Sequence, residues 1–109
     1  MISPVVDIST SGRGGSIYYR EGEQRIAFDW EFALPPAIVL IVGPKSDGWD
    51  SAYPWASGRR AEIFDFVGAE VVRQQVAGGG FEVDLESGVI EVLRPGKGGR
   101  QSFSVDKPE

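Results

Sequence analysis

Hydrophobic residues recur with a helical period in residues 59–76. Ile63, Phe64, Val67 and Val71 fall on a single stripe about 100° wide, and charged residues occupy the remaining surface. This pattern predicts an amphipathic helix that buries its apolar stripe against another element. The other apolar runs alternate with polar residues or are short and continuous, which predicts strands.

The ends of this helix carry start and stop signals. Ser57 can accept a hydrogen bond from a backbone N–H of the first turn. Asp50 or Ser51 could instead begin the helix one or two turns earlier. The three consecutive glycines at residues 78–80 end it.

The segment SIYYREGEQRIAFDWEF predicts an antiparallel hairpin with loop residues 22–23. The glycine takes the first position of a type II′ turn, where φ must be positive. Counting outward places Tyr19 opposite Ile26 and Ile17 opposite Phe28. The predicted apolar face consists of Ile17, Tyr19, Ile26, Phe28, Trp30 and Phe32. The opposite face carries Tyr18, Arg20, Asp29 and Glu31.

Two further apolar runs precede the helix. Residues 37–42, AIVLIV, are continuous and largely β-branched, and they follow a Pro-Pro pair. They predict a strand at a central position in the sheet. The N-terminal patch of Val5, Val6 and Ile8 is followed by a stretch rich in Ser and Gly, which favours an edge strand at most.

The last apolar segment, FEVDLESGVIEVL, alternates again and predicts a second hairpin with loop residues 87–88. This register places Leu85 opposite Ile90 and Val83 opposite Val92 on the core side, with Phe81 continuing the row. The opposite face carries Glu82, Asp84, Glu86 and Glu91.

These elements predict an α+β two-layer sandwich. Its sheet is mainly antiparallel, its order is β-β-β-α-β-β, and one helix packs on one face. We expect a single domain over residues 1–94. Residues 95–109 are rich in glycine and charge, which predicts a mobile C-terminal tail with at most a weak strand at residues 102–105.

The charge of the chain limits its partners. The 109 residues carry a formal charge of −5 with a pI near 4.7. This acidity argues against nucleic acid and against an anionic membrane, and it favours a basic protein partner. The chain has no cysteine, no apolar run long enough for a membrane span and no signal-peptide pattern. We therefore expect a soluble cytoplasmic protein.

The absence of histidine and cysteine excludes several kinds of catalysis. A Ser-His-Asp triad, a Cys-His pair and an ordinary zinc site all require residues that the chain lacks. The segments SGRGGS, GPKS and PGKGGR complete neither a phosphate-binding loop nor a dinucleotide fingerprint. We assign no catalytic residue, no cofactor and no metal ligand, and we favour a binding protein over an enzyme.

The first candidate site is the irregular loop at residues 45–57, which contains three large aromatic residues beside two carboxylates. They could stack and hydrogen-bond a ligand or a partner side chain. The two acids could alternatively form local turns, and the rings could close the open end of the core. The candidate residues are Asp47, Trp49, Asp50, Tyr53 and Trp55.

The second candidate site is the outer face of the sheet, where the pleat gathers carboxylates from both hairpins. Such a field would steer a basic partner, with Tyr18 as an apolar anchor. The alternative is an ordinary solvated sheet face. The acidic candidate residues are Asp29, Glu31, Glu82, Asp84 and Glu91.

In size, acidity and lack of catalytic groups, the chain resembles small bacterial proteins that act by binding. Immunity proteins and antitoxins that block a basic enzyme surface are examples, although no specific motif carries this resemblance. We expect a non-catalytic interaction module for a partner protein. The alternatives are a small-ligand binder or carboxylate-based hydrolase centred on residues 45–57, and a homodimer formed through edge strands.

Overall fold

The structure, a computed structural model, describes residues 3–35, 37–95 and 100–101. The strands within these residues are β1 (Val5–Ser11), β2 (Gly14–Glu21), β3 (Gln24–Phe32), β4 (Ala37–Val42), β5 (Gly80–Asp84), β6 (Val89–Leu93) and β7 (Arg100–Gln101). The helical segments are α1 (Trp49–Ala52), the 3-10 turn η1 (Pro54–Ala56) and the long helix α2 (Arg60–Gln75).

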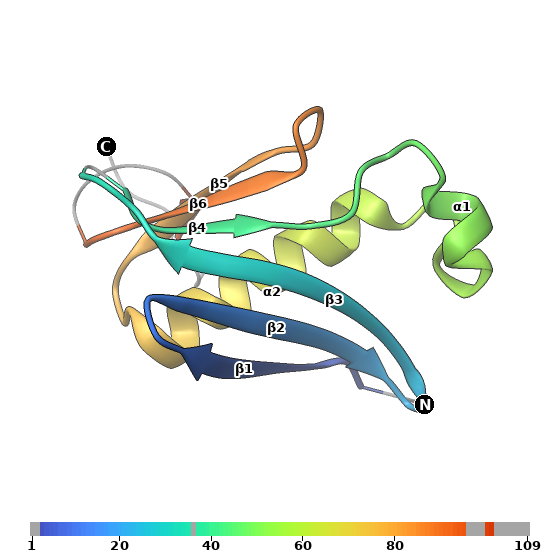
Figure 1. The fold of residues 1–109 in the computed structure, drawn as a ribbon, viewed down its shortest axis with the longest axis horizontal. Coiled ribbons are helices and arrows are strands. Elements are labelled where there is room, and N and C mark those ends of the chain that lie inside the picture. Colours follow the sequence, from blue (N-terminus) through green and yellow to red (C-terminus); the bar gives the residue numbers. More distant parts are fainter. Residues whose placement is uncertain (1–2, 36, 96–99, 102–109) are drawn as a thin grey trace, which may run out of the picture.

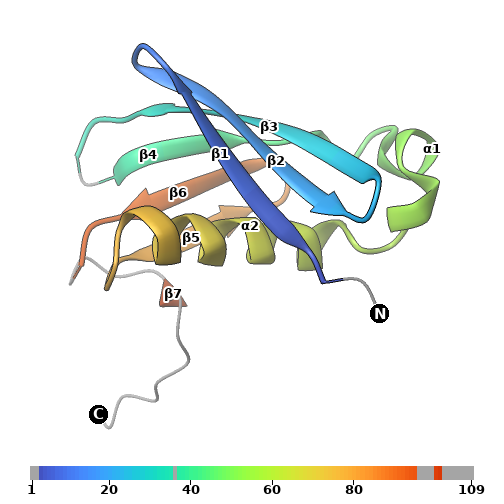
Figure 2. The same ribbon diagram turned by 90° about the horizontal axis from the view of Figure 1, so that it is seen from below.

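The strands form one antiparallel sheet in the order β1-β2-β3-β4-β6-β5-β7. Helix α2 lies along one face of the sheet, and the opposite face bears no described helix (Figure 1, Figure 2). The predicted α+β class and antiparallel sheet are confirmed. The predicted element order is confirmed in part, because β1 forms a full strand at the sheet edge and two short helical segments precede α2.

The first hairpin, β2–β3, has the predicted register. Tyr19 pairs with Ile26 and Ile17 pairs with Phe28, and Gly22 has a φ of 60° as the turn requires. Phe32, expected on the core face, is 55% exposed. It is the last residue of β3, where its ring meets that of Trp30 edge-on at 5.3 Å between centroids.

The second hairpin, β5–β6, differs from the prediction by two residues. Val83 pairs with Ile90 and Phe81 pairs with Val92. Because side chains alternate with a period of two, this even shift keeps each strand residue on its predicted face. Leu85 leaves the strand and is 36% exposed, so its expected core position was wrong.

Asp84 explains the longer loop of this hairpin. Its carboxylate accepts hydrogen bonds from the backbone N–H groups of Glu86 and Ser87 at 3.1 and 3.3 Å. Its carbonyl also accepts one from Gly88 at 2.9 Å. These bonds close a four-residue turn at residues 85–88, which replaces the two-residue turn that the Ser-Gly pair suggested.

The helix begins two residues later than Ser57 suggested. The residue preceding α2 is Arg59, no side chain caps the helix, and Ser57 instead follows η1. The earlier start at Asp50 or Ser51 is the separate helix α1. The break falls at Tyr53 and Pro54, because proline has no N–H to continue the ladder of α1.

The C-terminal segment contributes one described pairing. Arg100 and Gln101 form β7, which pairs with Phe81 and Gly80 of β5. The weak strand expected at residues 102–105 lies outside the described residues.

The core lies between α2 and the inner face of the sheet. Helix residues Ile63, Phe64, Val67 and Val72 are fully buried, and Val71 is nearly so. The sheet contributes Ile17, Tyr19, Ile26, Phe28, Ile41, Phe81, Ile90 and Val92 to this core. Each large apolar side chain gains about 1.5–3 kcal/mol by leaving water, so this contact fixes α2 on the sheet.

Gly68 sets the distance between α2 and β5. A Cβ at this position would lie 2.4 Å from Cδ2 of Phe81, which is buried. Alanine normally favours a helix over glycine by up to about 1 kcal/mol, whereas overpacking a core costs about 1–3 kcal/mol. At this site the cost of overpacking is larger than the gain in helix propensity.

We therefore predict that Gly68→Ala lowers the free energy of unfolding by about 1–2 kcal/mol, measured by urea denaturation. Trimming the ring that it meets, in the double variant Gly68→Ala/Phe81→Leu, should give a loss smaller than the sum of the two single losses. A Gly68→Ala protein more stable than the original would contradict the close helix–strand contact.

Candidate functional site

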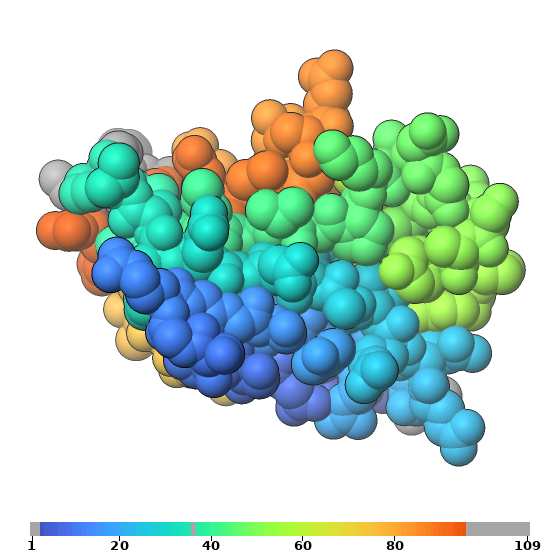
Figure 3. Space-filling model, viewed as in Figure 1, coloured from blue at the N-terminus to red at the C-terminus, as the bar shows by residue number. Residues whose placement is uncertain are grey.

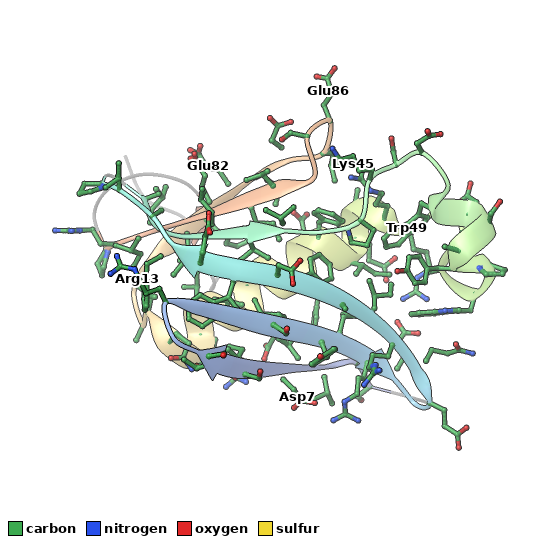
Figure 4. The ribbon with its side chains drawn as sticks, viewed as in Figure 1. Asp7, Arg13, Lys45, Trp49, Glu82 and Glu86 are labelled. Carbon is green, nitrogen blue, oxygen red and sulfur yellow. The ribbon has the colours of Figure 1, made fainter. Side chains whose placement is uncertain are left out.

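The aromatic loop begins with a buried residue. Trp49 is 3% exposed, and its indole N–H donates a hydrogen bond of 2.9 Å to the carbonyl of Ala56. Its ring lies 5.0 Å from that of Tyr53 and 6.4 Å from that of Phe64, measured between centroids. Figure 4 shows Trp49 on the side of α1 that faces α2. This ring is therefore part of the core and does not present a face to a ligand.

The other two rings continue the same cluster. Trp55 stacks on the ring of Tyr19 at 6.5 Å with an interplanar angle of 10°, and it meets Tyr53 edge-on at 6.4 Å. Both Tyr53 and Trp55 are half-buried. Of the two hypotheses for this loop, their packing favours closure of the core at the start of α2.

The two carboxylates of the loop differ in their contacts. Asp50 Oδ1 accepts a hydrogen bond from the backbone N–H of Gly58 at 3.3 Å, which ties α1 to the turn before α2. Asp47 is exposed in the bend that precedes α1. Their roles are those of turn residues on a solvated loop.

A polar cluster that the sequence did not indicate lies beside this loop. The hydroxyl of Tyr19 donates to the carboxylate of Glu21. Arg59 donates to the same carboxylate through both terminal nitrogens, and it also pairs with Glu62 at 2.9 Å. Spacing in β2 places Tyr19 and Glu21 on one face, but only the folded chain brings Arg59 to them.

The cluster alters the acid–base properties of its members. Hydrogen bonds from Arg59 and then from Tyr19 lower the pKa of Glu21 below its usual range. Burial raises the pKa of the Tyr19 hydroxyl, and its hydrogen bond to Glu21 raises it further. Every polar group in the cluster has a partner, so the cluster anchors the start of α2 to β2 and offers no reactive group.

The outer face of the sheet carries the second candidate site, and Figure 3 views this face directly. Strand pairing places its residues in two rows across β5, β6, β4 and β3. The first row is Glu82, Glu91, Leu40 and Glu31. The second row is Asp84, Val89, Val42 and Asp29. We call these eight residues the outer-face block.

The block has an apolar centre and acidic borders. Leu40, Val42 and Val89 form the centre, and Val42 is 43% exposed. The acids on β5 and β6 lie on one side of this centre, and those on β3 lie on the other. Within the described residues, no hydrogen bond or ion pair engages the exposed carboxylates of Asp29, Glu31, Glu82 and Glu91.

Two members of the predicted acidic face behave differently. The carboxylate of Asp84 is engaged in the hairpin turn described above. Tyr18 lies outside the block, where the guanidinium of Arg25 sits 4.8 Å above its ring and Asp7 pairs with Arg20 at 2.7 Å. Tyr18 therefore lies beside two arginines and one carboxylate, and not among the acidic residues of the face.

Neither a metal-binding cluster nor a membrane-spanning helix occurs in the described part of the chain. No group of three or more potential ligand side chains comes together there to hold a metal ion. No helix in that part has both the length and the apolar composition to cross a bilayer.

The pKa directions predict how stability depends on pH. The pKa of Glu21 is lower in the folded chain, so its contribution is present above the unfolded value of about 4.3 and is lost on acidification. The pKa of Tyr19 is higher in the folded chain, so its contribution is present below about pH 10 and is lost as the pH rises.

We predict that the free energy of unfolding falls on both sides of this window. Glu21→Gln should flatten part of the acid limb, and Tyr19→Phe should flatten the alkaline limb, in urea titrations repeated from pH 3 to about pH 11. Glu70, whose pKa is lowered mainly by Arg73, provides a control: Glu70→Gln should alter only the acid limb. An alkaline limb that is unchanged in Tyr19→Phe would contradict this assignment.

Comparison with protein-family models finds no match for this chain. Searches of curated proteins and of solved structures likewise find no significant similarity.

Proposed function

We propose that the protein is a non-catalytic interaction module that docks a basic protein partner on the outer face of its sheet. The observation that carries this proposal is the arrangement of the outer-face block. Unpaired carboxylates border both sides of a partly exposed apolar centre. A partner that presents an apolar contact between Lys or Arg residues would complement both features.

The electrostatics of the block favour this function over a purely structural one. Glu82 lies directly opposite Glu91 on the neighbouring strand. Like charges in such a pair destabilise a sheet, and the chain already carries a formal charge of −5. A cationic partner would relieve this repulsion, so part of the energy lost in the free protein would be regained on binding.

The dimensions of the block suit the centre of an interface. Its rows cross four strands, which corresponds to about 14 Å at the usual strand spacing. A stable protein interface buries about 800 Å² on each partner, so the surrounding sheet face would form the rim. Blocking a basic enzyme surface, as immunity proteins do, is one form that such binding could take.

Residues 45–57 are not proposed as a ligand or hydrolase site. Trp49 is buried against α2, and Asp50 is engaged with the turn at Gly58. The half-buried rings of Tyr53 and Trp55 pack on each other and on Tyr19.

The repulsion can be measured on the isolated protein. We predict that Glu82→Gln raises the free energy of unfolding by about 0.5 kcal/mol at low salt, because it removes one charge of the facing pair. The gain should shrink as ionic strength rises. Glu86→Gln, in the loop of the same hairpin (Figure 4), should change stability little and serves as the control. A Glu82→Gln protein less stable than the original would contradict the repulsion.

The binding proposal is tested by charge reversal. In pull-downs from the native host, Glu31→Lys/Glu91→Lys should lose the protein that the original chain captures, with affinity for the purified partner reduced on the order of tenfold. Asp84 is left unchanged because its carboxylate holds the hairpin turn.

The matched control is Glu23→Lys/Asp47→Lys, which makes the same change in net charge on exposed residues outside the block. This variant should retain capture. Capture that survives Glu31→Lys/Glu91→Lys, with both variants folded by circular dichroism, would overturn the proposed docking face.

A further inference from the structure

An apolar cleft of about 570 Å³ opens between the sheet and the C-terminal end of α2. Figure 2 shows why it forms: at the end of the molecule opposite α1, the β1–β2 turn and the β3–β4 loop rise away from α2. Ile8 and Ile17 line it from the first strands, Val39 from β4, and Val71 and Val76 from the end of the helix.

The two ends of the helix–sheet layer differ in how they are closed. At the start of α2, Trp49 fills the gap and is 3% exposed. At the other end, within the part of the chain that the structure describes, the apolar walls meet no such plug. Phe32, which lines the cleft and meets Trp30 edge-on, remains 55% exposed.

Trp30 forms a wall of this cleft because Gly15 lies opposite it on β2. A Cβ at Gly15 would stand 2.0 Å from the carbonyl oxygen of Ser9 and 2.9 Å from the indole nitrogen, so a side chain there would clash with both β1 and the ring. The indole N–H donates to the carbonyl of Ser9 on β1 at 3.0 Å. The polar atom of the ring is thus satisfied by the protein, and the rest of the ring is left as apolar wall.

One charged side chain borders the cleft. Arg94 follows the end of β6 and is exposed. It makes no ion pair with any residue that the structure describes. The other polar side chains at the cleft are Thr10 and Gln75, which are uncharged. An unpaired cation beside an apolar cavity is complementary to an anion that carries an apolar body.

We propose that this cleft is a binding site for a small aliphatic carboxylic acid, with its hydrocarbon chain between the sheet and α2 and its carboxylate at Arg94. A cavity of this volume falls within the range of ligand pockets, about 300–1,000 Å³. Burial of each CH₂ favours binding, and the guanidinium can donate two parallel hydrogen bonds to a carboxylate. The site lies on the helix side of the sheet, so it is independent of the outer-face block.

The test is a titration of the full-length ¹⁵N-labelled protein with octanoate, followed through the indole N–H resonances. The Trp30 resonance should shift and saturate, and the Trp49 resonance should stay in place. Arg94→Gln should weaken octanoate binding about fivefold, as expected for an exposed ion pair, and leave the binding of uncharged 1-octanol unchanged. Lys45→Gln removes a cation beyond the C-terminal end of β4 and should change the binding of neither octanoate nor octanol.

A second pair of variants tests the cavity itself. Ala33→Trp places a ring in the cleft from the β3–β4 loop and should abolish binding of both octanoate and octanol, whereas Ala52→Trp on exposed α1 should not. The proposal is overturned if Trp30 shows no saturable shift, if a folded Ala33→Trp protein binds as before, or if Arg94→Gln weakens octanol as much as octanoate.

Discussion

The packing of a single helix on one face of a wide, twisted sheet is the constraint from which the other features of this protein follow. A helix with its side chains is about 10–12 Å wide, whereas seven strands at about 4.8 Å spacing reach about 29 Å across. Because sheets twist, one straight helix cannot cover every strand closely. It packs most closely on β5, where Gly68 meets Phe81.

The consequences appear at the two ends and on the outer face. At the start of α2, a separate loop supplies Trp49 to close the core, and Arg59 ties the helix to Glu21. At its other end, the strands diverge and leave an apolar cleft. The outer face bears no described helix, which leaves the outer-face block open to solvent. The proposed docking face and the proposed ligand cleft are thus two results of the same architecture.

The sequence predicted those parts of the fold that local chemistry determines. The first hairpin was correct because Gly22 and the alternation of its strands agree on one register. The second hairpin was shifted because loops of two and of four residues preserve the same alternation, and only the bonds to Asp84 select the longer one. The length of strand β1 was underestimated because the strand is stabilised by tertiary contacts. It pairs with β2 along its whole length, and Val6 is buried in the core.

The candidate sites also differ in how far the sequence could predict them. The carboxylates of the outer-face block could be grouped from the pleat alone, because that grouping needs only the parity of each strand. The link between Tyr19, Glu21 and Arg59 depends on residues 38 positions apart in sequence, and no local pattern predicts it. The cleft could not be predicted from the sequence for the same reason. Its walls come from the first strands, the β3–β4 loop, the end of α2 and Arg94, which are far apart along the chain.

Closure of the core at one end only is tested most directly by the solvent exposure of two indole N–H groups, measured by NMR line broadening with a soluble paramagnetic agent. One helix that leaves part of the sheet uncovered, with a plug at one end only, predicts that the Trp49 resonance stays sharp, because its N–H is buried against Ala56. The Trp30 resonance, at the open end, should broaden strongly. Equal broadening of the two resonances, or a sharper Trp30, would contradict it.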